Sequence, residues 1–418
     1  MGMREEADKL LPALVAFSDE CIGTGSGPGP LFHALEIIAI DLEDKAEMPR
    51  LLKQARDVYA SGDPYLLGHI IRIENFVNSV DPNQRMNGLR EQIEATIVHA
   101  MSFAPGLMRM AFLEEAAALA TKHGINDLAD WAIAELQKIS LDDLDLKPIR
   151  SVTSIPAEAF EALVDAQFGD SLKETLENLV RQAPPSGSRE QNEEFGGRME
   201  KEAPLSSTIA RKHVGDDGLT RITATSPEDR EDERLARIEV MRIGLGGGEV
   251  VARVLETLVE HFGAEATEVL DALSGLPHLS ESVRSSVAKG LVYLTHGLYE
   301  EAATVTMPKA ETLVRALADE KKVLRYRVQR DAADGGRSTR GQYPQLGALL
   351  ADIRPWLDPS WDRFLTTFLV SPFGKNYRND LLHGYIDEVQ RVDAALTILC
   401  ALRLMLIPLA EGEAETDE

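Results

Sequence analysis

Residues 392–407 read VDAALTILCALRLMLI, and this stretch indicates how the C-terminal half of the chain folds. Its apolar side chains surround a helix on nearly all sides, which is typical of a buried helix. The wider apolar run from Ala394 to Leu409 is interrupted by Arg403 and Pro408 and is too short to span a bilayer. We therefore expect a core helix that is buried within one subunit or between two.

Apolar residues at helical spacing predict further helices on the N-terminal side of this stretch. They cover 231–243, 248–262, 265–274, 280–295, 298–318, 344–355, 358–370, 375–384 and 386–407. We expect a C-terminal helical domain over 231–409, followed by an acidic tail at 410–418. The glycines at 244 and 246–248 resemble a phosphate loop, but they follow a helix and no Lys-Ser or Lys-Thr pair comes after them. We interpret them as a turn between helices.

Residues 1–183 show the same helical periodicity, with breakers such as Asp63-Pro64 and Asp81-Pro82 between the apolar faces. They predict an N-terminal helical array or bundle with a regulatory or partner-binding role. Residues 184–230 carry few periodic apolar residues and are expected to form a linker or mobile insertion, with one short strand near 219–225. The predicted fold class is all-α.

The charge of the chain excludes some classes of partner. Its 418 residues contain 44 Lys and Arg against 69 Asp and Glu, a net charge of −25. Nonspecific binding to duplexes and adsorption to anionic membranes both need a surplus of basic residues, so neither is expected. Cys21 and Cys400 cannot form a disulfide framework, and no signal peptide is apparent, so a cytoplasmic protein is predicted. The scattered histidines predict neither a metal nor a cofactor.

Residues 368–384, FLVSPFGKNYRNDLLHG, are the segment most suggestive of chemistry. Pro372 and Gly374 should end the preceding helix, so that a new one begins near Lys375. On that helix Asn379 and His383 are four residues apart and share a face. Arg378 lies about 140° around the helix from His383 and flanks that face.

These residue types suit chemistry at a phosphoester. The imidazole of His383 can accept and donate protons. The guanidinium of Arg378 can stabilise charge that develops on phosphoryl oxygens. The carboxamide of Asn379 can position the imidazole or a sugar hydroxyl.

The pattern Arg378-Asn379-x-x-x-His383-Gly384 resembles the signature of the HEPN (higher eukaryote and prokaryote nucleotide-binding) superfamily. With the residues before it, it looks like the uncharacterised RNxxxHG family, also found in the eukaryotic endoplasmic-reticulum-membrane-associated RNA degradation protein. The segments 290–315 and 346–350 are similar to the same family, so the resemblance covers roughly 275–405. The three residues within the motif, Asp380, Leu381 and Leu382, differ from those of the RNxxxHG family, whose members often carry a basic residue there.

The resemblance implies a helical bundle that pairs about a two-fold axis and brings two copies of the motif into one cleft. It implies metal-independent cleavage of RNA to a 2′,3′-cyclic phosphate, with Arg378, Asn379 and His383 as catalytic residues. It also implies a role in defence, toxicity or stress, and a homodimer formed through the C-terminal domain.

A basic strip between 321 and 340 adds a second candidate RNA contact. Seven basic residues outweigh Asp331 and Asp334 there, giving a local charge of +5 in an acidic chain. The strip is equally compatible with a solvated helix end and loop. Its basic residues are Lys321, Lys322, Arg325, Arg327, Arg330, Arg337 and Arg340.

A second hypothesis is that the protein is not a catalyst. The chain would be a helical dimerisation or interaction protein whose motif is structural or binds a nucleotide, and the net charge of −25 favours it. Under both hypotheses a protein partner at the N-terminal helices is expected.

Overall fold

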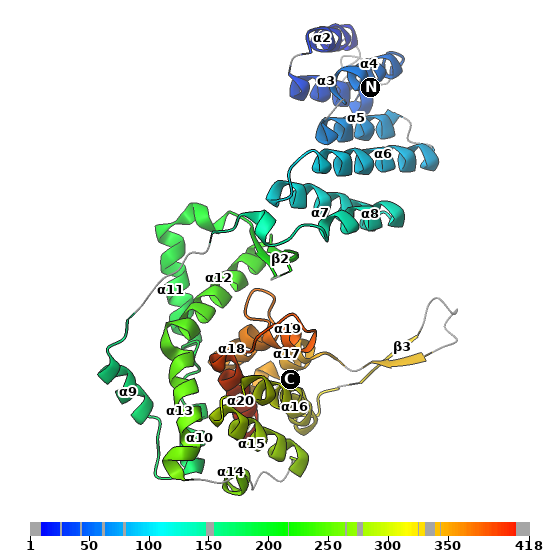
Figure 1. The fold of residues 1–418 in the computed structure, drawn as a ribbon. Coiled ribbons are helices and arrows are strands. Elements are labelled where there is room, and N and C mark those ends of the chain that lie inside the picture. Colours follow the sequence, from blue (N-terminus) through cyan, green and yellow to red (C-terminus); the bar gives the residue numbers. More distant parts are fainter. Residues whose placement is uncertain are drawn as a thin grey trace, which may run out of the picture. The chain divides into compact units, whose positions relative to one another are not determined.

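The computed structural model describes residues 10–25, 27–41, 44–60, 63–77, 81–147, 154–215, 217–263, 266–273, 279–324, 326–330, 339–342 and 344–406. Helices dominate these residues, with two short two-stranded hairpins, which confirms the predicted all-α fold class (Figure 1). The chain divides into two compact units. The first contains residues 1–148 and 215–219, and the second contains residues 149–214 and 220–418.

In the first unit, helices that follow one another along the chain pack together. They are α2 (Leu11–Thr24), α3 (Pro28–Asp41), α4 (Met48–Tyr59), α5 (Pro64–Val77), α6 (Pro82–Met101), α7 (Leu107–Lys122) and α8 (Asn126–Leu136), with a 3₁₀ turn η1 (Asp142–Leu144). Proline in the first turn begins each of α2 to α6, where its missing N–H leaves no helical hydrogen bond unmade. Leu31, Leu35 and Ile70 are fully buried in the core that α2 to α5 share.

The second unit is built around one central helix, α20. Its helices are α9 (Ala157–Asp165), α10 (Leu172–Arg181), α11 (Arg189–Glu202), α12 (Pro227–Arg242), α13 (Gly248–Phe262), α14 (Ala266–Ala272), α15 (Glu281–Thr295), α16 (Tyr299–Glu320), α17 (Leu346–Ile353), α18 (Pro359–Leu369), α19 (Tyr377–Leu382) and α20 (Arg391–Leu406). Short 3₁₀ turns are η2 (Pro204–Ser207) and η4 (Arg354–Trp356). Helix α20 packs against α10, α13, α15 and α16, and every residue from Ala394 to Leu402 is fully buried. The prediction of a core helix in this stretch is confirmed.

The boundary between the units lies earlier than residue 183, where the sequence analysis placed it. Helix α10 belongs to the second unit because Leu176 and Val180 are fully buried in its core. The guanidinium of Arg403, on α20, donates a hydrogen bond to the carbonyl of Val180 at 3.1 Å. Periodicity identifies such a helix but does not show which core its apolar face joins.

The segment 184–230, expected to be a linker, is folded. It contains α11, η2, the first residues of α12 and a hairpin of β1 (Arg211–Val214) and β2 (Thr220–Ala224). The strands are antiparallel, with Arg211 opposite Ala224. The predicted strand near 219–225 is β2. Its partner and α11 were missed because α11 (REQNEEFGGRMEKE) and β1 (RKHV) present few apolar residues.

The glycine-rich junction joins α12 to α13 through a π-helical turn, Ile243–Gly247, in which Gly246 has a φ of +136°. A side chain at Gly247 would run into the backbone of Pro185, and one at Gly248 would meet Val392. These glycines permit close packing, so their interpretation as a turn between helices is confirmed.

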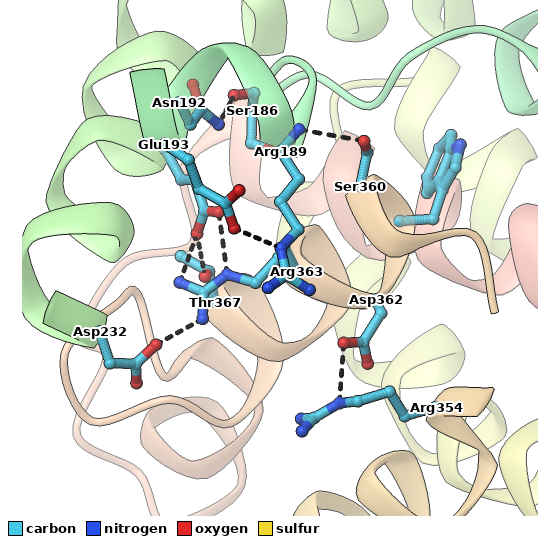
Figure 2. Close-up of polar contacts among 12 residues, drawn as sticks. Ser186, Arg189, Asn192, Glu193, Asp232, Arg354, Ser360, Asp362, Arg363 and Thr367 are labelled. Carbon is cyan, nitrogen blue, oxygen red and sulfur yellow. Dashed lines mark hydrogen bonds and ion pairs between the residues drawn. The ribbon is translucent and has the colours of Figure 1, made fainter. Parts of the chain in front are cut away.

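Helix α18 is fixed to α12 by a buried ion-pair network. The guanidinium of Arg363 donates to both carboxylate oxygens of Glu239, at 3.0 and 3.1 Å, and also contacts Asp232. Figure 2 shows Asp232, Arg363 and Thr367 converging, and the hydroxyl of Thr367 donates to the Glu239 carboxylate as well. Because α18 leads directly into residues 370–384, this network positions the segment singled out by sequence.

Candidate functional site

A tight loop connects α18 to α19. The N–H of Gly374 donates to the carbonyl of Ser371 at 2.9 Å, and the N–H of Lys375 donates to the carbonyl of Thr367 at 2.9 Å. A Cβ at Gly374 would collide with that same Thr367 carbonyl, so only glycine fits here. The helix predicted over 375–384 is shorter, because Asn376 lies in the left-handed region with a φ of +48° and α19 begins after it.

Tyr377 anchors the start of α19 in the core. It is 3% exposed, and its ring stacks on Phe368 with centroids 5.2 Å apart. Phe368 stacks in turn on Phe364, one helical turn earlier in α18. Burial raises the pKa of the Tyr377 hydroxyl, which makes no hydrogen bond within the described part of the chain. The aromatic stack thereby fixes the backbone on which the next two residues are placed.

Arg378 and Asn379 are joined directly. The Nη1 of Arg378 donates to Oδ1 of Asn379 at 2.9 Å, and its Nη2 donates to Oε2 of Glu311, on α16, at 2.8 Å. Glu311 also pairs with Arg315. The Nδ2 of Asn379 donates to Oδ1 of Asn376 at 2.7 Å. The side chains of Arg378 and Glu311 are 19% and 17% exposed, so the pair is largely shielded from water.

His383 occupies the C-terminal end of α19 and is exposed. Its N–H donates to the carbonyl of Asn379 at 3.0 Å, as expected for residues four apart on one helix. Among the described residues, no hydrogen bond joins its ring to Arg378 or Asn379. Gly384, with a φ of +73°, then turns the chain. The motif therefore has a half-buried Arg–Asn part and a solvent-facing imidazole.

Tyr385 lies beside the imidazole, and Arg221 lies beside Tyr385. The ring centroids of His383 and Tyr385 are 6.4 Å apart, and the guanidinium of Arg221, on β2, lies 4.4 Å from the centroid of the Tyr385 ring. Tyr385 is 46% exposed. The hairpin is held near this segment because Phe373 packs in one apolar cluster with Ala224 and Ala236. Arg221 and Tyr385 thus present a cationic and aromatic surface next to His383.

Arg378, Asn379 and His383 were predicted from the sequence, but the side chains around them were not. Glu311 belongs to the segment 290–315, for which the sequence predicted a similarity to the RNxxxHG family, and that prediction was the signal available for it. Arg221 gave no such signal, because its approach to Tyr385 depends on how a short hairpin packs on a distant part of the chain.

The basic strip is divided in the structure. Lys321 follows the end of α16, and Lys322 is exposed with a φ of +57°. Strands β3 (Arg327–Arg330) and β4 (Thr339–Gln342) form an antiparallel hairpin in which Gln329 pairs with Arg340. Arg327, Arg330 and Arg340 are therefore strand residues. From the sequence, a helix end and a loop were considered for this strip, and strands were not. Arg325 and Arg337, and the acidic tail at 410–418, lie outside the described residues.

The described residues contain neither a cluster of potential metal ligands nor a helix able to span a membrane. No three or more His, Cys, Asp or Glu side chains gather there as potential metal ligands. None of the helices seen there has the length and apolar character needed to cross a bilayer. Comparison of the chain with protein-family models, curated proteins and solved structures gave no match.

Proposed function

We propose that this chain is a metal-independent endoribonuclease of HEPN type whose active site contains Arg378, Asn379 and His383. One observation carries the proposal: Glu311 and Asn379 hold the guanidinium of Arg378 in place on α19, and the exposed imidazole of His383 caps the C-terminus of the same short helix. A guanidinium has five N–H donors, and the two hydrogen bonds described above use only part of that capacity. Arg378 can therefore be positioned and still bind a phosphoryl group.

The reaction follows from these groups. A neutral imidazole of His383 accepts the proton of a ribose 2′-hydroxyl, and the 2′-oxygen bonds to the adjacent phosphorus. Arg378 stabilises the negative charge on the phosphoryl oxygens. The bond from phosphorus to the 5′-oxygen then breaks, and that oxygen takes a proton from a second, protonated imidazole. The products are a 2′,3′-cyclic phosphate and a 5′-hydroxyl.

This scheme needs an acid and a base at the same moment, and a single imidazole cannot be both. A homodimer formed through the C-terminal domain, as the resemblance implies, would supply the second His383. The stacked Arg221 and Tyr385 support an RNA substrate, because bases stack on exposed aromatic rings and on arginine. The net charge of −25 would weaken binding of bulk RNA and favour a selected substrate.

The test is cleavage of a labelled single-stranded RNA in the presence of EDTA, with the product ends identified by mass spectrometry. We expect cyclic phosphate ends from the wild type and a loss of about 10²- to 10⁴-fold in rate for His383→Ala and Arg378→Ala. His296→Ala is the matched control, because His296 is also exposed at the C-terminal end of a helix of the same unit, α15. The corresponding deoxyribose oligonucleotide should remain intact.

Two results would contradict the proposal. One is a His383→Ala variant that cleaves as fast as the wild type. The other is a fully active protein that light scattering shows to be monomeric at the assay concentration, since the second imidazole would then be missing.

A second function is favoured by the same hydrogen bonds. The contact of Arg378 with Glu311 also fastens α19 to α16, and the contact of Asn379 with Asn376 fixes the start of α19; both suit a structural motif in a helical interaction protein. In that case Arg378→Ala would lower the melting temperature, and the wild type would leave RNA intact.

A further inference from the structure

A cleft of about 480 Å³ lies between α11, α12 and β1, and four arginines and three glutamates line it. Arg230, Arg234 and Arg237 are spaced i, i+4 and i+7 on α12 and therefore share one face of that helix. Arg211 joins them from β1. The three glutamates are Glu200, Glu231 and Glu233.

One buried carboxylate, that of Glu233, forms ion pairs with two of these arginines. Glu233 is 3% exposed, and its carboxylate lies 2.9 Å from Nη1 of Arg211 and 3.4 Å from Nε of Arg237. The ring of His213 lies 3.7 Å from the same carboxylate. Burial alone would raise the pKa of Glu233, but His213 and the two arginines outweigh it and hold that pKa below its ordinary value. Glu233 is therefore ionised at neutral pH, and a single negative charge faces two guanidinium groups.

The positive charges of the other two arginines of the cleft, Arg230 and Arg234, are only weakly balanced by nearby carboxylates. Arg234 pairs at 2.8 Å with Glu200, whose side chain is 48% exposed and well solvated. The Nε of Arg234 is buried and has no hydrogen-bond partner in the part of the chain that the structure describes. Arg230 donates to the carbonyl of Thr225 at 2.6 Å and contacts no carboxylate among the described residues. With four arginines against three glutamates, the cleft carries a small positive charge although the chain as a whole is acidic.

The arginine side chains, and not the end of α12, make this cleft suitable for an anion. Ser226 and Asp229 form a capping box that uses N–H groups at the start of the helix. Guanidinium groups that approach from three turns of α12 and from β1 can reach more acceptor oxygens than one carboxylate offers. Planar N–H forks match phosphate oxygens, and the volume exceeds what a single phosphate needs.

We propose that this cleft binds an anion carrying two linked phosphates, either free pyrophosphate or the diphosphate of a nucleotide. Arg230 and Arg237 would make the new contacts, while Glu233 keeps Arg211 and Arg237 oriented toward the cleft. This site shares no residue with Arg378, Asn379 and His383, so its occupancy can be measured without RNA and independently of cleavage.

Isothermal titration of the full chain with sodium pyrophosphate, in 150 mM NaCl, tests the proposal. We expect one site per chain and an affinity that falls at least tenfold in Arg230→Gln and in Arg237→Gln. Arg253→Gln is the matched control, because Arg253 is exposed on α13 and lies outside the cleft. Circular dichroism would establish that each variant is folded, and Arg230→Lys, which keeps the charge, should retain part of the affinity.

A parallel titration with ADP separates the two sources of the diphosphate. Tighter binding of ADP than of pyrophosphate supports a nucleotide, and equal or weaker binding supports the free anion. The proposal is overturned if neither probe binds the wild type, or if the Arg230→Gln and Arg237→Gln variants bind both probes with unchanged affinity.

Discussion

Asp362 lies in a buried position that disfavours its charged form. It is 2% exposed, Oδ2 accepts a hydrogen bond from Nε of Arg354 at 2.9 Å, and Oδ1 has no partner within the described residues (Figure 2). Arg354 is half exposed, so its compensation is weakened by solvent. Burial raises the pKa of Asp362 above its ordinary value, and the opposing attraction of Arg354 and Arg363 does not cancel this.

The sign of the pH dependence follows. A folded pKa above the unfolded one means that the native state binds this proton more tightly, so the contribution of Asp362 to stability falls as pH rises from about 3.8 through the folded pKa. Asp362→Asn keeps the shape of the side chain and removes the charge. We expect its free energy of unfolding, relative to the wild type, to increase between pH 4 and pH 7.

Urea titrations at a series of pH values measure this difference. Asp170→Asn, at an exposed position of the same unit, should follow the wild type at every pH. A relative stability of Asp362→Asn that decreases toward neutral pH would show that the Arg354 pair outweighs desolvation.

At this scale the sequence could supply the residue types of the candidate site but only part of its surroundings. The spacing of Arg378, Asn379 and His383 predicts their order on a helix. It does not predict that Arg378 reaches Glu311 or that His383 stays exposed. Those features depend on packing between α16 and α19, which lie far apart in the sequence.

At the scale of elements, close packing and backbone hydrogen bonds constrain the loop between α18 and α19. Gly374→Ala would place a methyl group against the carbonyl of Thr367, a backbone atom that cannot move without distorting α18. We expect a loss of about 2–4 kcal/mol in the free energy of unfolding, since overpacking and backbone strain act together. Urea unfolding followed by circular dichroism measures it.

Gly347→Ala is the control for this substitution. Its methyl group would meet Val370 only at an ordinary contact distance of 3.7 Å, and Gly347 lies in the helix α17. Its stability should stay the same or rise by up to about 1 kcal/mol, because alanine favours helices over glycine. Equal losses in both variants would mean that the Thr367 carbonyl is not the cause.

Helices were predicted well where one apolar face has a regular period. Residues 248–262 were predicted as a helix and form α13. Errors occurred where the backbone leaves the helical region, as at Asn376, and where hydrogen bonds replace apolar burial. Asn192 of α11 illustrates the second case, because it is buried and donates to the carbonyl of Ser186 at 3.0 Å. No apolar period marks such a residue.

At the scale of the whole molecule, the all-α class could be predicted, but the division of the chain could not. Helix α10 is strongly amphipathic, and so is α4 of the first unit, so this pattern does not separate the two units. What assigns α10 to the second unit is its burial against α13 and α20, a long-range choice that local composition does not encode.

The two cysteines are buried in different units, so each can report when its own unit opens. Cys21 is buried in the core of the first unit, where the hydroxyl of Tyr59 donates to its carbonyl at 2.8 Å. Cys400 is fully buried on α20 in the second unit, and burial raises the pKa of its thiol. Alkylation requires an accessible thiolate, so each cysteine reacts only when its own unit opens.

The chain therefore carries one intrinsic reporter of local opening in each unit. Alkylation with iodoacetamide over a series of urea concentrations, followed by peptide mass spectrometry, would give two labelling curves from one sample. We expect the midpoints to differ, because each thiol lies in a separate core. Coincident curves would mean that the two cores open as one cooperative transition. Cys21→Ser and Cys400→Ala would assign each curve to its unit, without any dye or tag added to the protein.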